Sequence, residues 1–315
     1  MTAEDKYLEY IASVKRYSPR TRQIYADIIH GFSEFAPDAD VPDVSLLRGY
    51  EVHLMEDRKA GARTVSQHIS VLSGYCRFLM KEGLLKSNPA KLVAKPKEEK
   101  RLPVFYREES MREYFRATDF YVSEEYLDVI RGSSDTKAYE NLLRRIVVSI
   151  LYSTGIRRAE LIGLKRNSVD LGRKILKVHG KGDKMRDVPL TDSLCKEISL
   201  YLTVQNVIVG TDSAEMPLLC TPKGGSLYPM WVDRAIKKEL GSVKGITGRK
   251  SPHVLRHTLA SELLENGTDL NSIKELLGHS SLAATQVYTH TTIERLRDVY
   301  ENAHPRAKNG GKNGN

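Results

Sequence analysis

Six side chains that can bind anions, transfer protons or act as nucleophiles stand within short motifs in the second half of the chain. They are Arg157, Lys181, His253, Arg256, His279 and Tyr288. Two guanidinium groups can hold a phosphate, and imidazole or ammonium groups can move protons. A phenol can serve as a nucleophile. If these groups converge, they can break a phosphodiester through a covalent phosphotyrosine without a metal ion.

The proposed chemistry explains why each kind of group is needed. The pKa of a tyrosine phenol is about 10. Tyr288 therefore needs nearby cations and a proton acceptor before it can attack at neutral pH. Arg157 and Arg256 can balance the negative charge of a pentacoordinate transition state. The departing alkoxide needs a proton, which a lysine or a histidine can supply.

Each of these residues taken alone has a simpler interpretation. The chain holds 16 Tyr and 9 His, and most such residues in a protein are structural. His253 and His257 are four residues apart, but no Glu follows His253 as the H-E-x-x-H zinc motif requires. The segment 180–182, Gly-Lys-Gly, lacks the pattern of a nucleotide-binding loop. Only the ordered combination favours phosphodiester chemistry, and neither a metal nor a cofactor is expected.

Local signals predict the elements that carry Arg157 and Lys181. An apolar stretch over residues 142–151 predicts a helix that ends at Gly155, two residues before Arg157. Strand-like runs at residues 174–178 and 185–190 predict a β-hairpin. Lys181 then lies near the tip of that hairpin.

Two further helices are predicted around the histidines. Ser251 is expected to cap a helix that starts at Pro252 and runs to residues 266–267, Asn-Gly. This places His253 and Arg256 on one face near a helix N-terminus, which attracts anions. A second short helix, from residue 269 to residue 278, leads into His279, and Tyr288 lies near the end of the next helical stretch.

The first segment, residues 5–92, predicts an all-helical domain. Ser18 and Pro19 are typical of a helix start, and another helix begins near Arg63. The apolar stripe of that second helix is formed by Val65, Ile69, Leu72, Tyr75 and Leu79. Its opposite face carries Arg63, Ser66, Gln67, His68 and Arg77. On the residue types alone, a solvated polar face is the more common interpretation of such a pattern.

Composition indicates a two-domain protein with a polyanionic partner. The length of 315 residues suits two domains. Residues 91–103 are rich in Lys and Arg and predict an extended basic linker that could run along a phosphate backbone. The formal net charge of +9 favours nucleic acid as the partner, although many basic proteins bind none.

The cellular setting is also predicted from composition. Cys76, Cys195 and Cys220 are odd in number and form no C-x-x-C pair, which favours a reduced intracellular setting. No apolar run is long enough to span a membrane, and the first fifteen residues lack the apolar core of a signal peptide. We therefore expect a cytoplasmic protein with a disordered Gly/Asn/Lys-rich tail over residues 305–315.

These motifs resemble the tyrosine recombinase (phage integrase) family, and Xer-like site-specific recombinases in particular. The resemblance rests on residues 152–161, 180–184, 253–257, 276–280 and 286–290, and on the helical patterns at residues 18–35 and 63–89. It implies a mainly α fold with a small β-sheet or hairpin, arranged as a two-domain, C-shaped DNA clamp. The implied domains are a helical core-binding domain over 1–92, a basic linker over 93–103 and a mixed α+β catalytic domain over 104–304.

The resemblance also implies a role for each candidate residue. Arg157 and Arg256 match the residues that bind the scissile phosphate, His253 and His279 match residues that bond its oxygens, and Tyr288 matches the nucleophile. Lys181 matches the general acid, with Lys184 as an alternative, and Glu160 matches a supporting acid. The expected DNA contacts are Arg63, Thr64, Ser66, Gln67, His68, Lys95, Lys97 and Lys184.

The expected partner is double-stranded DNA with paired inverted sites. The family implies a dimer on each site and a tetramer in the synapse, formed by this chain alone or with a related recombinase, and strand exchange through a Holliday junction. A type IB topoisomerase-like enzyme and a non-catalytic DNA-binding regulator are the alternatives. Chromosome dimer resolution, DNA inversion and mobile-element integration remain open as biological roles.

Overall fold

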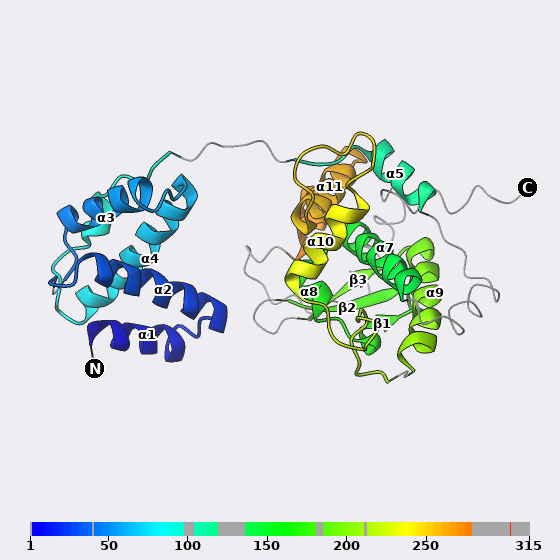
Figure 1. Ribbon diagram of the computed structural model, residues 1–315, viewed down its shortest axis with the longest axis horizontal. Helices are drawn as coiled ribbons and strands as arrows, with labels where there is room; N and C mark the ends of the chain where they lie inside the picture. Colours follow the sequence, from blue (N-terminus) through cyan, green and yellow to red (C-terminus); the bar gives the residue numbers. More distant parts are fainter. Residues whose placement is uncertain are drawn as a thin grey trace, which may run out of the picture. The chain divides into compact units, whose positions relative to one another are not determined.

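The chain forms two compact units, Met1–Arg101 and Leu102–Asn315. The computed structural model describes residues 2–39, 41–97, 104–118, 136–180, 185–210, 213–278 and 303. Both units consist mainly of helices, and the second also contains a three-stranded sheet (Figure 1). The prediction of a mainly helical chain with a small sheet is confirmed.

Helix α4 is the centre of the first unit. The elements of this unit are α1 (Ala3–Ser13), α2 (Pro19–Phe35), α3 (Val44–Glu56), α4 (Ala62–Lys81) and the 3₁₀ turn η1 (Pro89–Leu92). The other four elements all contact α4. Its predicted apolar stripe, from Val65 to Leu79, is buried. Ser18 caps α2 through the backbone N–H of Thr21, as its position before Pro19 predicts.

The predicted linker differs from the structure at its start. Val93 is buried in the core of the first unit, because η1 folds the chain back onto α3 and α4. The Lys95 ammonium then donates a hydrogen bond of 2.9 Å to Ser70 Oγ on α4. Residues 93–95 therefore belong to the first unit, whereas residues 98–103 lie outside the described part of the chain.

Helix α7 is the centre of the second unit. It spans Lys137–Thr154, is buried along most of its length, and packs against α8, α9, α10 and α11 (Figure 1). The helices around it are α5 (Glu108–Ala117), α8 (Arg158–Ile162), α9 (Asp192–Val209), α10 (Pro229–Glu239), α11 (Pro252–Glu265) and α12 (Leu270–Leu277). The apolar run at residues 142–151 supplies the buried surface, as predicted.

The sheet is antiparallel with the order β1-β2-β3. Strands β2 (Ile175–His179) and β3 (Met185–Pro189) form the predicted hairpin, and His179 pairs with Met185 next to its tip. Strand β1 (Val169–Asp170), which follows the 3₁₀ turn η2 (Arg166–Ser168), was not predicted. Two residues are too few to produce an alternating pattern.

Glycines and one aspartate define the helix ends nearest to the candidate site. Gly155 ends α7 with a φ of 60°, and Gly278 ends α12 with a φ of 66°, both in the left-handed region. Asp269 caps α12 by accepting hydrogen bonds from two backbone N–H groups. These three termini lie where the sequence predicts them. Among the described residues, no helix is long and apolar enough to cross a membrane.

Candidate active site

Arg157 is held at both ends of its guanidinium group. It precedes α8, so its backbone N–H is free of that helix and donates to Glu160 Oε2 at 2.8 Å. Its Nη1 donates to Glu160 Oε1 at 2.9 Å, and its Nη2 donates to the carbonyl oxygen of Gly278 at 2.9 Å. The side chain remains 38% exposed. Arg157 is thus oriented by the protein and still accessible to a ligand.

Arg256 reaches the same region from α11. Its Nη1 donates to the carbonyl oxygen of Gly155, and its Nη2 donates to that of Leu277, both at 2.6 Å. Both acceptors lie at C-terminal helix ends, where carbonyl oxygens have no partner within the helix. The two arginines therefore meet where α7, α11 and α12 converge.

Glu160 links Arg157 to a third arginine, Arg186 on β3. Arg186 Nη1 and Nη2 donate to the two oxygens of the Glu160 carboxylate at 3.0 and 2.7 Å, and both side chains are buried. Burial by itself raises the pKa of Glu160. Hydrogen bonds from Arg186 and from the Arg157 backbone outweigh that effect and leave the pKa below its ordinary value. Glu160 is therefore ionised at neutral pH.

The cluster carries an excess of positive charge. Among the described residues, Glu160 is the one carboxylate that hydrogen-bonds Arg157 or Arg186. Burial, together with the charges of Arg157 and Arg186, lowers the pKa of Arg256 to about 10. Arg256 still carries its charge at neutral pH. A bound phosphate would offset the repulsion among the three arginines.

His253 lies near this cluster with an exposed side chain. Burial of part of the ring lowers its pKa, and the positive charges of His257, Arg158 and Arg256 lower it further. Its imidazole is therefore largely neutral near pH 7 and can accept a proton. One expectation for this helix is wrong: Ser251 occupies the cap position, but its hydroxyl makes no cap hydrogen bond and is buried without a partner among the described residues.

Four predicted site residues lie outside the described part of the chain. Lys181 and Lys184 belong to the segment between β2 and β3, and His279 and Tyr288 follow Gly278. Their chain neighbours do reach the cluster: Arg186 follows the hairpin tip on β3, and the carbonyl of Gly278 accepts from Arg157. No group of three or more His, Cys, Asp or Glu side chains in the described ranges could hold a metal ion.

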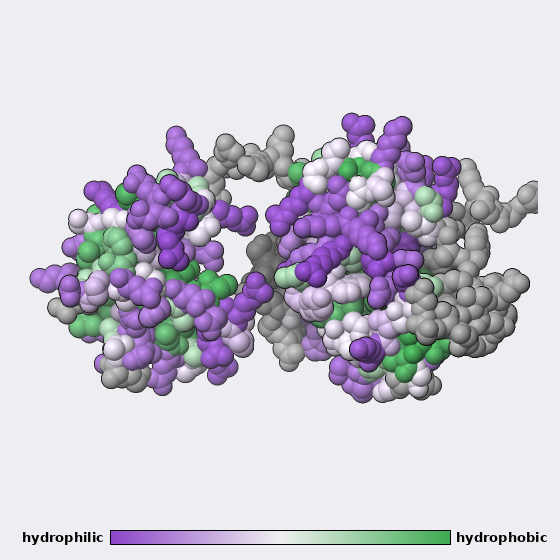
Figure 2. Space-filling model, viewed as in Figure 1, coloured by the Kyte–Doolittle hydropathy of each residue, from purple (hydrophilic) through white to green (hydrophobic). Residues whose placement is uncertain are grey.

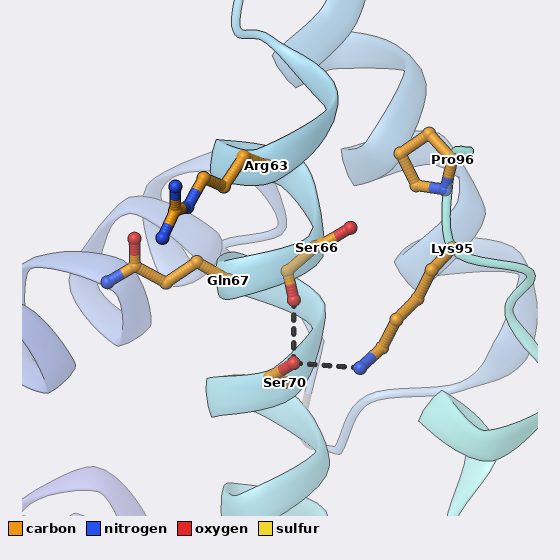
Figure 3. A pocket seen from close by; sticks show the side chains of 6 residues that line it. All are labelled: Arg63, Ser66, Gln67, Ser70, Lys95 and Pro96. Carbon is orange, nitrogen blue, oxygen red and sulfur yellow. Dashed lines mark hydrogen bonds between the residues drawn. The ribbon is translucent and has the colours of Figure 1, made fainter. Parts of the chain in front are cut away.

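Four of the predicted DNA-contacting residues of the first unit lie around one surface of α4: Arg63, Ser66, Gln67 and Lys95. A pocket there is lined by Arg63, Ser66, Gln67, Ser70, Lys95 and Pro96 (Figure 3). Lys95 reaches across from the segment after η1 to Ser70 (Figure 3). Thr64 and Lys97 are also exposed, and each is next in sequence to a residue that lines the pocket. His68 differs, because its Nδ1 is 3.1 Å from the Tyr50 hydroxyl and the residue is half-buried.

A second polar surface lies over α10 in the other unit. Figure 2 shows hydrophilic residues gathered over this helix on the face in view. Its exposed residues include Arg234, Lys237 and Lys238. Arg158, the residue after Arg157, forms an ion pair with Asp233 on α10. This surface is therefore cationic.

Sequence reasoning missed Arg186 and Ser70. Arg186 stands two residues before the buried Val188 on β3, so the period-two pattern of the strand predicts that both side chains face the core. A buried arginine requires a carboxylate partner, and Glu160 was already a candidate. Ser70 carried a comparable signal, since it stands four residues after Ser66 on the predicted polar face.

Comparison with known proteins identifies the family. Residues 124–295 match the phage integrase family, and residues 5–83 match the phage integrase N-terminal SAM-like domain. The tyrosine recombinase XerC of Bacillus licheniformis is 36% identical over 316 residues, which cover 96% of each chain. That of Chlorobaculum parvum is 33% identical over 321 residues, covering 96% of this chain and 94% of the relative.

Solved structures with a similar fold include a site-specific recombinase and an integrase. The XerH site-specific recombinase bound to a palindromic difH substrate matches with a TM-score of 0.65 at 20% identity, over 94% of this chain and 83% of that one. A lambda integrase dimer bound to a COC′ core site matches with a TM-score of 0.62 at 17% identity, over 90% of this chain and 98% of that one. Neither alternative, the topoisomerase or the non-catalytic regulator, gains support from these matches. The chain belongs to the phage integrase family and is a Xer-like tyrosine recombinase, an enzyme of site-specific DNA recombination.

Proposed function

We propose that the arginine cluster binds the scissile phosphate of duplex DNA and that Tyr288 cleaves it. The observation that supports this most is the convergence of Arg157 and Arg256 at the carbonyl groups of Gly155, Leu277 and Gly278. The excess positive charge there suits one phosphodiester anion. Fixed guanidinium groups also stabilise the charge that develops in the transition state, without reorganising during the reaction.

The proposed step is a transesterification. The Tyr288 phenol oxygen attacks the phosphorus atom, and the bond from phosphorus to the 5′-oxygen breaks. The phenol proton passes to His253, whose depressed pKa keeps it neutral and able to accept. Lys181 donates a proton to the departing 5′-oxygen, and His279 donates a hydrogen bond to the phosphate. The 3′-phosphotyrosine retains the energy of the broken ester, so rejoining needs neither ATP nor a metal.

DNA is the proposed partner, and two protomers occupy one site. Similar chains were solved as a lambda integrase dimer on a core site and as XerH on a palindromic substrate. By analogy, this chain would bind inverted half-sites as a dimer and pair two such sites in a tetramer. The α4 surface with Arg63 and Lys95, the linker residue Lys97, and the hairpin residue Lys184 are the proposed DNA contacts. We also propose that the protein acts on the nucleoid, in the cytoplasm.

Trapping the covalent intermediate tests this function. Wild-type protein incubated with its DNA and quenched in SDS should yield a stable protein–DNA adduct. The variant Tyr288→Phe should bind DNA with nearly unchanged affinity but give no adduct. An adduct that persists in Tyr288→Phe would remove this tyrosine from the nucleophile role. Sequencing the DNA trapped on the wild type then identifies the site that is recombined.

A further inference from the structure

Arg186 has no role in the reaction described above, yet it occupies a central position in the cluster. It lies on β3, opposite Val178 in the sheet, and the hairpin tip with Lys181 immediately precedes this strand. Its side chain is 7% exposed and points away from solvent into the space between β3, α8 and the end of α12. A buried guanidinium group is costly to desolvate, and the two hydrogen bonds from Arg186 to Glu160 offset part of that cost.

Glu160 connects Arg186 directly to Arg157. Each oxygen of the carboxylate accepts one hydrogen bond from each arginine. Oε1 accepts from Arg157 Nη1 at 2.9 Å and from Arg186 Nη1 at 3.0 Å. Oε2 accepts from the Arg157 backbone N–H at 2.8 Å and from Arg186 Nη2 at 2.7 Å. Movement of Arg186 would therefore release the carboxylate that orients Arg157.

Gly278 provides a second connection between the two arginines. Its carbonyl oxygen accepts the hydrogen bond from Arg157 Nη2. A Cβ atom at Gly278 would lie 3.0 Å from the Arg186 guanidinium carbon, so the two groups are in close contact. Arg186 therefore contacts both groups that hold Arg157: it packs against Gly278 and donates hydrogen bonds to Glu160.

We propose that Arg186 is a positioning residue for DNA cleavage. It holds the buried Glu160 in a single orientation, so that Arg157 is directed at the scissile phosphate. Through Glu160 it also links Arg157 to the β2–β3 hairpin. A lysine at this position would keep the charge but could not make the two parallel hydrogen bonds of a guanidinium group. The inference rests on the proposed function, since it assumes that Arg157 binds the phosphate.

The test compares Arg186→Lys with wild-type protein in single-turnover cleavage, measured as SDS-stable adduct at saturating DNA. Misplacement of a catalytic group by about 1 Å can cost roughly 100-fold in rate. We expect cleavage to slow by about 10- to 100-fold, with a DNA affinity within about two-fold of wild type. An unchanged cleavage rate would overturn the inference. If the wild type itself forms no adduct, the proposed function fails instead.

A substrate change distinguishes positioning of Arg157 from other effects. A methylphosphonate at the scissile position carries no charge and depends less on a guanidinium group. The defect of Arg186→Lys should therefore shrink on this DNA, as should that of Arg157→Lys. A defect that shrinks instead on DNA with a 5′-bridging phosphorothiolate, which needs no general acid, would show that Arg186 acts on Lys181 and would overturn the proposal. So would an equal defect on all three substrates.

Two further variants keep the test valid if Arg186→Lys is unstable. Glu160→Gln should show the same pattern across substrates. The double variant, Arg186→Lys with Glu160→Gln, should be little worse than either single variant, because both substitutions break the same link between Arg186 and Arg157. Additive losses would contradict a shared action. The matched control is Arg145→Lys, since Arg145 is equally buried and pairs with Glu197, away from the cluster. Arg145→Lys should lower the stability, which thermal unfolding would measure. Any cleavage defect that it causes should not shrink on methylphosphonate DNA.

Discussion

The Arg256 guanidinium donates a hydrogen bond of 2.6 Å to the carbonyl oxygen of Gly155, a residue 101 positions earlier in the chain. The same glycine ends α7 in the left-handed region and packs against Leu277 of α12. One backbone turn therefore serves both the packing of three helices and the orientation of an arginine in the site.

The substitution Gly155→Ala should damage both functions of this turn. An added Cβ would lie 2.5 Å from Leu277 Cδ2, and the φ of 60° is unfavourable for alanine. We expect a loss of roughly 2–4 kcal/mol in the free energy of unfolding, measured in urea. Gly210→Ala is the matched control, because Gly210 has a φ of 71° and no atom of the described residues beyond its chain neighbours lies within 4 Å of an added Cβ. It should lose only about 1 kcal/mol, and equal losses would contradict the steric argument.

The proposed general acid can be tested through the leaving group. Lys181→Ala should slow cleavage of ordinary DNA by about 10²- to 10⁴-fold, because the 5′-oxygen then leaves without a proton. On DNA with a 5′-bridging phosphorothiolate the leaving thiolate needs no proton, so the defect should largely disappear. Lys184→Ala tests the alternative general acid, and its defect should be similar on both substrates. Equal defects of Lys181→Ala on both substrates would transfer the acid role to another group.

Much of the site was predictable because its helix ends are encoded locally. Asp269 and Gly278 lie at the start and end of one short helix, and each signal acts within a few residues. The pairing of Arg186 with Glu160 was not predicted, because Glu160 lies 26 residues earlier and on another element. The same applies to Val93, whose burial depends on η1 folding back onto α3 and α4. Pairings between distant segments leave only weak traces in a single sequence.

Glu262 should make the stability of the second unit depend on pH. Burial raises the pKa of this carboxyl to about 8, despite a hydrogen bond from the Tyr152 hydroxyl, and Glu108 and Glu265 raise it further. The folded state therefore retains a proton that the unfolded chain releases above its ordinary pKa of 4.5. The stabilising contribution is complete below pH 4.5 and is lost as the pH rises to about 8.

The variant Glu262→Gln isolates this effect. It keeps an acceptor for Tyr152 but cannot ionise, so its unfolding free energy should lack this contribution to the pH dependence. The wild type should lose up to about 1.4 kcal/mol per pH unit relative to the variant within that window. Urea denaturation between pH 5 and 9 would measure the difference. Parallel stability curves for the two proteins would contradict a proton held by Glu262.

His253 should set the acidic limit of cleavage. Its pKa lies below the ordinary value of 6.5 because of burial and the neighbouring positive charges. At DNA concentrations well below saturation the pH–rate profile reports the free enzyme, so the rate should stay constant down to pH 6.5 and fall only below it. His253→Gln should be slow and lack this fall, whereas His257→Gln should retain it. A wild-type rate that already declines above pH 6.5 would exclude His253 as the proton acceptor.

The α4 surface should contribute to the salt dependence of DNA binding. Each phosphate contact that a protein makes with duplex DNA steepens the slope of log K against log salt by about 0.9. Arg63→Ala and Lys95→Ala each remove one cation from the pocket in Figure 3, and each should lower the slope by about that amount. Lys15→Ala, which removes a cation that does not line this pocket, is the control. Titrations by fluorescence anisotropy at several salt concentrations would give the slopes, and a slope unchanged in both pocket variants would exclude this surface as a phosphate contact.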